Sequence, residues 1–115
     1  MHEASLVQNM FRVIERSFEG RSGIIRKVHV SVGDLSGAIP EALVSAFDML
    51  KEGTILQEAE LCMERDPLRL RCLACGEEYE ASSLPACCPQ CQSEAVRIIG
   101  GEDIFIQSLE VAESG

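Results

Sequence analysis

Residues 72–91 read CLACGEEYEASSLPACCPQC and contain two Cys-x-x-Cys pairs, with twelve residues between the first pair and the second. Two intervening residues let both sulfurs of a pair reach one ion from a tight turn, and Gly76 relieves the turn after the first pair. Two such turns facing each other supply four thiolates in the tetrahedron of a closed structural zinc site. The predicted zinc ligands are Cys72, Cys75, Cys88 and Cys91.

Other chemistries of paired cysteines define the alternatives. Four cysteines can also ligate an iron–sulfur cluster, and the spacing alone does not exclude this. A thioredoxin-like redox pair would need a Cys-x-x-Cys motif at a helix N-terminus in a βαβ context, which neither pair has. Free reduced thiols fit this spacing poorly. Zinc is therefore the predicted ion, with an iron–sulfur cluster as the rival.

Two further cysteines lie outside the paired motifs. Cys87 could replace Cys88 as a ligand, but three residues would then separate it from Cys91. Because Cys-Pro-x-Cys keeps the tight turn, we expect Cys88 to be the ligand and Cys87 to be a spare thiol. Cys62 falls on the acidic face of an expected strand, and we interpret it as an incidental half-buried residue.

The segment around the pairs, residues 66–100, has few large apolar side chains and is expected to be loop-like. A segment of about 35 residues is too small to fold on a core of its own, so metal binding must supply the missing free energy. We therefore expect residues 66–100 to form a zinc-binding domain. It interrupts a second domain, which consists of residues 1–65 and 101–115.

The flanking residues predict two helices. Apolar side chains recur at i, i+4, i+7 and i+11 from Val7 to Phe18, and Gly20 ends this first helix. A second helix is expected to start at Pro40, which suits a first turn, with Gly53 as a C-cap. Its apolar stripe consists of Leu43, Phe47 and Leu50.

Three segments predict strands. Residues 26–32 alternate between valines and polar side chains, a second strand is expected at about 55–65, and a third apolar run extends from Asp103 to Val111. A strand–helix–strand unit favours a parallel pair with a right-handed crossover, and the third strand could return antiparallel after the insert. The predicted fold class is α+β: a small mixed three-stranded sheet with two helices, plus an inserted four-cysteine zinc-ribbon module.

The composition excludes several classes of function. The 115 residues include 10 basic and 19 acidic side chains, and a net charge of −9 argues against nucleic-acid binding. Apolar residues make up 46%, enough for a folded core, and no apolar run approaches the roughly 20 residues that span a bilayer. An acidic N-terminus is not that of a signal peptide, so we expect a cytoplasmic protein without a membrane partner.

The second residue, His2, gives the N-terminus a specific metal chemistry. The free amine of Met1, the deprotonated amide nitrogen of His2 and its imidazole can chelate one ion, and the Glu3 amide or carboxylate can add a fourth donor. Nitrogen and oxygen donors in a plane suit Ni(II) or Cu(II). We expect Met1 to be retained because histidine is a large second residue. On the residues alone, an incidental terminal histidine is the favoured interpretation.

The sequence contains no recognisable catalytic constellation. It lacks a Ser-His-Asp arrangement, paired carboxylates and the phosphate-binding motif GxxxxGK[ST]. The second histidine, His29, lies in the middle of an expected strand and is interpreted as a residue of its polar face rather than a base. We therefore predict that the protein is not an enzyme.

The whole chain resembles the HypA/HybF family of nickel metallochaperones. The resemblance begins with Met1-His2-Glu3 and the amphipathic helix, continues through Gly33-Asp34-Leu35-Ser36 and Pro40-Glu41-Ala42-Leu43, and includes Glu52-Gly53-Thr54, the cysteine pairs and Ser108-Leu109-Glu110. Each motif is weak singly, but their order and spacing together are highly specific. The family architecture is a zinc ribbon inserted before the last strand of an α/β unit.

The resemblance implies that the protein carries Ni(II) for maturation of [NiFe]-hydrogenase. It implies nickel binding at His2, Glu3 and Met1, and zinc binding at the four paired cysteines, so that residues 1–65 and 101–115 would be the nickel-binding domain. It also implies the HypB GTPase and the hydrogenase large subunit as partners, with urease served in some organisms. Asp34 and Glu41 match family positions, but we assign them no ligand role.

A protein-interaction adaptor is the alternative function. Such a zinc-ribbon protein would bind zinc and show no nickel affinity that depends on His2. A thiol oxidoreductase would require a reversible disulfide across a Cys-x-x-Cys motif with zinc absent. The sequence does not fix the oligomeric state, for which we expect a monomer or a weak homodimer.

Overall fold

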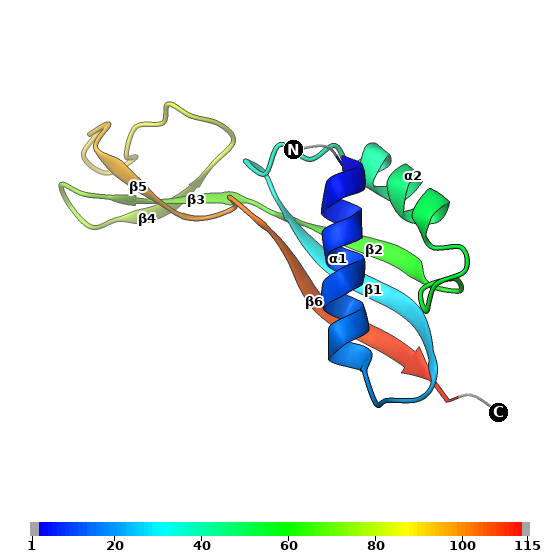
Figure 1. The fold of residues 1–115 in the computed structure, drawn as a ribbon. Helices are drawn as coiled ribbons and strands as arrows, with labels where there is room; N and C mark the ends of the chain where they lie inside the picture. Colours follow the sequence, from blue (N-terminus) through cyan, green and yellow to red (C-terminus); the bar gives the residue numbers. More distant parts are fainter. Residues whose placement is uncertain (1–2, 114–115) are drawn as a thin grey trace. The chain divides into compact units, whose positions relative to one another are not determined.

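The computed structural model describes residues 3–113, which form two helices and six strands. In chain order these are α1 (Glu3–Phe18), β1 (Ile24–Gly33), α2 (Pro40–Leu50), β2 (Glu60–Asp66), β3 (Leu68–Cys72), β4 (Glu78–Ala81), β5 (Val96–Gly100) and β6 (Ile104–Ala112). The strands form two three-stranded sheets, with the orders β2-β1-β6 and β4-β3-β5. Both sheets can be followed in Figure 1.

The chain divides into two compact units. The first contains the chain up to Val30, Gly37–Glu64 and the chain from Phe105, and the second contains Ser31–Ser36 and Arg65–Ile104. The first unit holds both helices and the sheet β2-β1-β6, whereas the second holds the sheet β4-β3-β5. Among the described residues, the helices are too short or too polar to cross a membrane.

In the first unit, α1 and α2 cover one face of the sheet (Figure 1). Val28 and Val30 of β1 are fully buried, as the alternation of apolar and polar residues in this strand predicts. The rings of Phe11 on α1 and Phe47 on α2 meet edge to face with centroids 5.4 Å apart and planes at 88°. This aromatic pair joins the two helices over the sheet.

The first sheet is mixed, which confirms the predicted fold class. Figure 1 shows β1 and β2 running in the same direction, while β6 returns in the opposite direction. An ion pair of 3.9 Å joins Arg26, near the start of β1, to Glu58, just before the start of β2. At the other edge, Gly23 before β1 lies against the end of β6, at Ala112, as an antiparallel pairing requires.

Two predicted boundaries in the first unit are wrong. Helix α2 ends at Leu50 with Lys51 as its C-cap, and Gly53 lies in the following turn with φ +77° rather than at the cap. The strand expected from about residue 55 starts only at Glu60. The reason is a run of turns over residues 52–58, in which Thr54 Oγ1 donates to the Lys51 carbonyl at 2.6 Å. These turns bury Leu56.

The loop-like character expected for residues 66–100 is also wrong. Strands β4 and β5 pair antiparallel with the two edges of β3. In β3 the residues Leu68, Leu70 and Cys72 are buried, while the two arginines between them are exposed. This alternation of buried and exposed residues is a strand signal that the sequence itself carries.

A close backbone contact organises the start of the second unit. A Cβ atom added to Gly33 would lie 2.5 Å from the carbonyl oxygen of Gly101, so only glycine fits there. Beside it, the Asp34 carboxylate accepts hydrogen bonds from Nε and Nη2 of Arg65 at 2.8 and 2.7 Å. These bonds hold the pKa of Asp34 below its usual range. Asp34 is therefore an anchoring residue of this unit.

The contact between Phe11 and Phe47 should contribute to the stability of the first unit. Phe47→Ala should lower the free energy of unfolding by about 3–5 kcal/mol, because it removes a fully buried ring and leaves a cavity against Phe11. Chemical denaturation followed by circular dichroism measures this change. Met49→Ala is the matched control on the same helix, since Met49 is 79% exposed. A loss for Phe47→Ala as small as that of the control would contradict this packing.

Candidate metal centre

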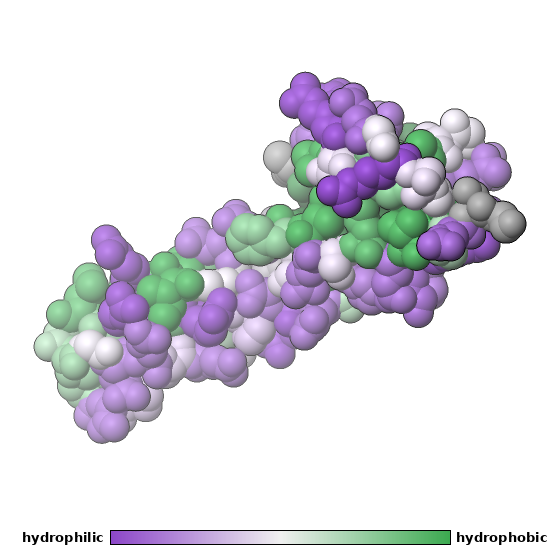
Figure 2. Space-filling model, turned by 90° about the horizontal axis from the view of Figure 1, so that it is seen from below, coloured by the Kyte–Doolittle hydropathy of each residue, from purple (hydrophilic) through white to green (hydrophobic). Residues whose placement is uncertain are grey.

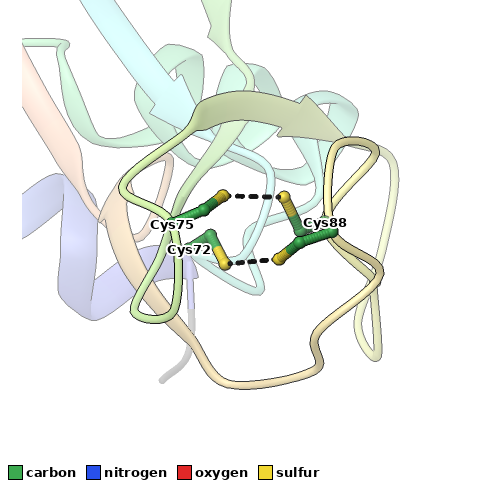
Figure 3. Close-up of side chains that lie close together, drawn as sticks. Cys72, Cys75 and Cys88 are labelled. Atoms are coloured by element: carbon green, nitrogen blue, oxygen red, sulfur yellow. Dashed lines mark hydrogen bonds between the residues drawn. The ribbon is translucent and has the colours of Figure 1, made fainter.

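Four cysteine sulfurs of the second unit converge on one point. Their Sγ atoms all lie within 4.8 Å of one another, the only such group of three or more metal-binding side chains among residues 3–113. The Sγ–Sγ distances are 3.4 Å between Cys72 and Cys91 and 3.6 Å between Cys75 and Cys88. Figure 3 shows these side chains facing each other across the gap between two turns. A tetrahedral ion with Zn–S bonds of about 2.3 Å needs edges of about 3.8 Å, so the cluster fits zinc.

The two turns that present the cysteines have the same backbone design. In the first turn, the N–H of Ala74 donates to the Cys72 sulfur at 3.4 Å, and in the second, the N–H of Gln90 donates to the Cys88 sulfur at 3.4 Å. Each turn closes with a residue in the left-handed region, Gly76 with φ +82° and Gln92 with φ +63°. A left-handed Gln is uncommon and explains why only the first turn carries a visible glycine signal.

The cluster has a buried and an exposed side. Cys72 and Cys88 are fully buried, whereas Cys75 and Cys91 are exposed. The first cysteine of each pair is thus part of the interior, and the second faces solvent. All four residues predicted as zinc ligands meet here, as the spacing of the two motifs requires.

Proton affinities differ strongly between the clustered thiols. The backbone N–H of Cys75 favours the Cys72 thiolate and lowers the pKa of Cys72 to about 6. The backbone N–H of Glu77 favours the Cys75 thiolate, but burial and the neighbouring thiols outweigh it and raise the pKa of Cys75 to about 12. One thiol therefore ionises first and keeps a neighbour protonated until a cation enters.

The two remaining cysteines lie outside the four-sulfur group. Cys87 is exposed, and its thiol points toward the Glu94 carboxylate with a separation of 3.9 Å. Cys62 is half-buried on β2 of the first unit. The arrangement of sulfurs therefore favours Cys88 over Cys87 as the fourth member of the cluster.

His29 has a partner that the sequence did not suggest. Its Nε2 atom contacts the carboxylate of Glu110 on β6, and this hydrogen bond holds the pKa of Glu110 below its usual range. The pair links β1 to β6 within the first unit. This agrees with the interpretation of His29 as a residue of the strand's polar face.

The predicted nickel ligands lie at the edge of the described chain. Met1 and His2 lie outside the described residues. Glu3 is the first residue of α1 and is partly exposed. The first four N–H groups of a helix have no partner within it, so the Glu3 amide is not engaged in α1 hydrogen bonding.

The fold and the four-thiol cluster define a small α+β protein with an inserted metal-binding ribbon. A family profile described as "Hydrogenase/urease nickel incorporation, metallochaperone, hypA" matches residues 1–111. The chain therefore belongs to the HypA family of nickel metallochaperones, which confirms the resemblance stated from the sequence.

Individual relatives agree along the whole chain. The Hydrogenase maturation factor HypA of Aquifex aeolicus is 44% identical over 112 residues, covering 96% of this chain and 97% of the relative. That of Shewanella halifaxensis is 37% identical over 115 residues, covering 99% and 100%. The solution structure of the Ni metallochaperone HypA from Helicobacter pylori has a TM-score of 0.72 with 26% identity, covering 99% of this chain and all of the other. Another solution structure of a HypA protein has a TM-score of 0.76 at 26% identity, covering 99% and 98%.

The thiol pKa values predict how zinc affinity depends on pH. Zinc binds thiolates, so each protonated cluster thiol must lose its proton when the ion enters. Because the pKa of Cys75 is raised to about 12 while that of Cys72 is about 6, affinity should rise as the pH is raised above 6. Competition with a chelating dye between pH 6 and 8 measures this slope. Calorimetry in two buffers of different protonation enthalpy counts the released protons, and a pH-independent affinity would contradict the prediction.

Proposed function

We propose that this protein delivers Ni(II) for the maturation of [NiFe]-hydrogenase and carries zinc as a structural ion. The observation that carries the proposal is the family match over residues 1–111, which spans both the N-terminal motif and the cysteine pairs. The family description includes urease as well as hydrogenase, so nickel delivery to urease is a further role of the same kind. Hydrogenase maturation is named in the relatives that cover nearly the whole chain.

The two functions are assigned to two domains. We assign nickel binding to residues 1–65 and 101–115 and zinc binding to residues 66–100. The four-sulfur cluster lies wholly within residues 66–100, at the end of β3 and on the turns that precede β4 and β5. A closed site of four thiolates leaves no position for a substrate, which suits a structural ion and not a transferred one.

The zinc ligands that we propose are Cys72, Cys75, Cys88 and Cys91. Their support is the convergence of four sulfurs and the N–H groups that point at two of them. The hydrophobic contribution of this unit is small, with Leu68 and Leu70 as its fully buried aliphatic side chains among the described residues. Zinc binding therefore contributes directly to the folding of this unit.

The proposed nickel ligands are His2, Glu3 and Met1. A terminal amine, a deprotonated amide and an imidazole form a planar donor set that suits Ni(II). The start of α1 at Glu3 supports this chelate, because the first N–H groups of the helix are not used by the helix itself. Such an open chelate can exchange its donors one at a time, which delivery of the ion requires.

Nickel delivery is a transfer and needs no catalytic residue, so we assign the protein no enzymatic activity. The ion has to be handed to an acceptor, for which we propose the hydrogenase large subunit, with the HypB GTPase as the cooperating partner. The family role in hydrogenase maturation implies contact with the maturation machinery. The resemblance seen in the sequence supplies the identity of these two partners. The location that fits this work is the cytoplasm.

A zinc-dependent adaptor remains the second candidate. Figure 2 shows apolar surface, in green, on the second unit. Two leucines of the loops in this unit, Leu73 and Leu84, are 63% and 43% exposed. Exposed apolar side chains close to a rigid metal site favour contact with another protein. This alternative shares the zinc site but predicts no nickel affinity through His2.

The zinc assignment predicts a difference between two neighbouring cysteines. Cys88→Ser should reduce bound zinc from about one ion per chain to a small fraction and unfold the second unit, since Cys88 is a buried member of the cluster. Cys87→Ser is the matched control and should keep its zinc, because Cys87 is exposed and lies outside the cluster. Metal analysis after purification without chelator, with circular dichroism, measures both. Zinc loss in Cys87→Ser alone would assign the fourth ligand to Cys87.

The nickel assignment predicts a difference between the two histidines. His2→Ala should abolish saturable Ni(II) binding to the zinc-loaded protein, because it removes the imidazole of the proposed chelate. His29→Gln is the control, since His29 is engaged by Glu110 within the sheet. Calorimetry and absorption spectroscopy on untagged protein with Met1 as its first residue measure the binding. Nickel binding that survives in His2→Ala would favour the adaptor over the metallochaperone.

A further inference from the structure

The hydroxyl group of Tyr79 is an unexplained feature of the second unit. It is the one buried side-chain oxygen or nitrogen atom of residues 3–113 that has no hydrogen-bond partner. A buried hydroxyl without a partner costs folding free energy, so such groups normally have a donor or acceptor nearby. Tyr79 is also the only tyrosine of the sequence, which contains no tryptophan.

The register of the second sheet places Tyr79 beside the metal cluster. Tyr79 on β4 lies directly opposite Leu70 on β3, so both side chains are on the same face of the sheet. Cys72 follows two residues after Leu70 and shares its buried face. Cys72 and Tyr79 are therefore diagonal neighbours, at a separation that a tyrosine ring can bridge.

The electrostatics of Tyr79 agree with this placement. Burial, followed by the negative charge of the cluster sulfurs, raises the pKa of Tyr79, and among the sulfurs Cys88 acts most strongly and Cys72 next. Because its pKa is raised, the phenol keeps its proton and can donate a hydrogen bond to one of the nearby sulfurs. The missing partner of the hydroxyl is therefore to be sought among the sulfurs.

The Tyr79 hydroxyl makes no hydrogen bond to a sulfur in the structure, and the charge of Cys88 acts on it most strongly among the sulfurs, so Cys88 is the acceptor inferred for the metal-bound site. Cys88 is fully buried, and the hydrogen bond that its sulfur receives from the backbone comes from Gln90. Four thiolates around a divalent cation carry a net charge of −2, so a buried thiolate gains from each donor that points at it. In a chain of net charge −9, such donors replace the stabilisation that positive side chains would give.

We propose that Tyr79 is a positioning residue of the metal site, whose hydroxyl donates a hydrogen bond to the metal-bound thiolate of Cys88. The inference rests on the proposed zinc site and concerns the shell around it rather than its ligands. Hydrogen bonds to ligating sulfurs orient the ligand and reduce the negative charge on the sulfur. The Tyr79 hydroxyl therefore tightens the hold on the ion and fixes the second turn against β4.

The test compares Tyr79→Phe with the wild-type protein, both loaded with Zn(II) or Co(II). Loss of the hydroxyl should weaken Zn(II) affinity about tenfold in competition with a chelating dye, as loss of an outer-shell partner does elsewhere. It should also move the sulfur-to-cobalt charge-transfer bands to longer wavelength, because a cobalt-bound thiolate that receives no hydrogen bond from Tyr79 gives up an electron more easily. Ser82→Ala is the control, since it removes an exposed hydroxyl from the same unit. The phenylalanine keeps the ring, and circular dichroism checks the fold.

The outcomes separate the inference from the zinc site itself. Affinity and charge-transfer bands in Tyr79→Phe that equal those of wild type would overturn the hydrogen bond and leave the zinc site intact. A wild-type protein that binds neither Zn(II) nor Co(II) would overturn the zinc site as well. Should Tyr79→Phe fail to fold, nuclear magnetic resonance of wild-type protein loaded with ¹¹³Cd decides. A slowly exchanging Tyr79 hydroxyl proton coupled to the cadmium through Cys88 supports the bond, and a rapidly exchanging one overturns it.

Discussion

The second unit of this protein depends on the convergence of four sulfurs on a single point. The chain supplies the unit with little else that is buried, since β3 contributes two leucines to its interior and β4 and β5 are mostly half-exposed. Two hairpin-like turns hold the sulfurs at 3.4 and 3.6 Å, and without a cation these clustered thiol groups gain little from one another. A divalent cation changes this balance, because it draws off protons and converts the thiols into bonded ligands. The metal therefore takes the place of a hydrophobic core.

The first unit is stabilised by a different kind of interaction. Its two helices and mixed sheet bury aliphatic side chains and the pair of Phe11 and Phe47, so its folding does not call for an ion. The metal site that we propose at the N-terminus is therefore not needed for the folding of this unit. A structural ion and a transferred ion need opposite properties, and the two proposed sites lie in separate parts of the chain. In this proposal the closed cluster of thiolates retains its ion and the terminal chelate releases its own.

Sequence reasoning found most of the features that a local pattern encodes, and it could not find contacts between residues far apart in the chain. The cysteine cluster was predictable because each pair is set by a turn of four residues, and helices α1 and α2 followed from their apolar spacing. Strand β3 carried a readable alternation that the loop expectation overlooked. The contact between His29 and Glu110 joins residues 81 positions apart, so no local pattern in the sequence predicts it. The end of α2 was misplaced because the Lys51 N–H makes the last hydrogen bond of the helix, to the Phe47 carbonyl, and the Thr54 hydroxyl then satisfies the Lys51 carbonyl.

The asymmetry within the cluster bears on how the zinc-binding unit can work. Each pair places one sulfur in the interior and one at the surface, and the backbone N–H groups of Ala74 and Gln90 point at the two interior sulfurs. An attacking chelator or thiol therefore meets Cys75 and Cys91 first, while the interior sulfurs keep hold of the ion. Loss of the ion requires release from both sides, and the two interior sulfurs also receive partly buried hydrogen bonds from the backbone. A structural site of this kind would keep its ion while the proposed N-terminal chelate exchanges nickel, because competing ligands meet its two exposed sulfurs first.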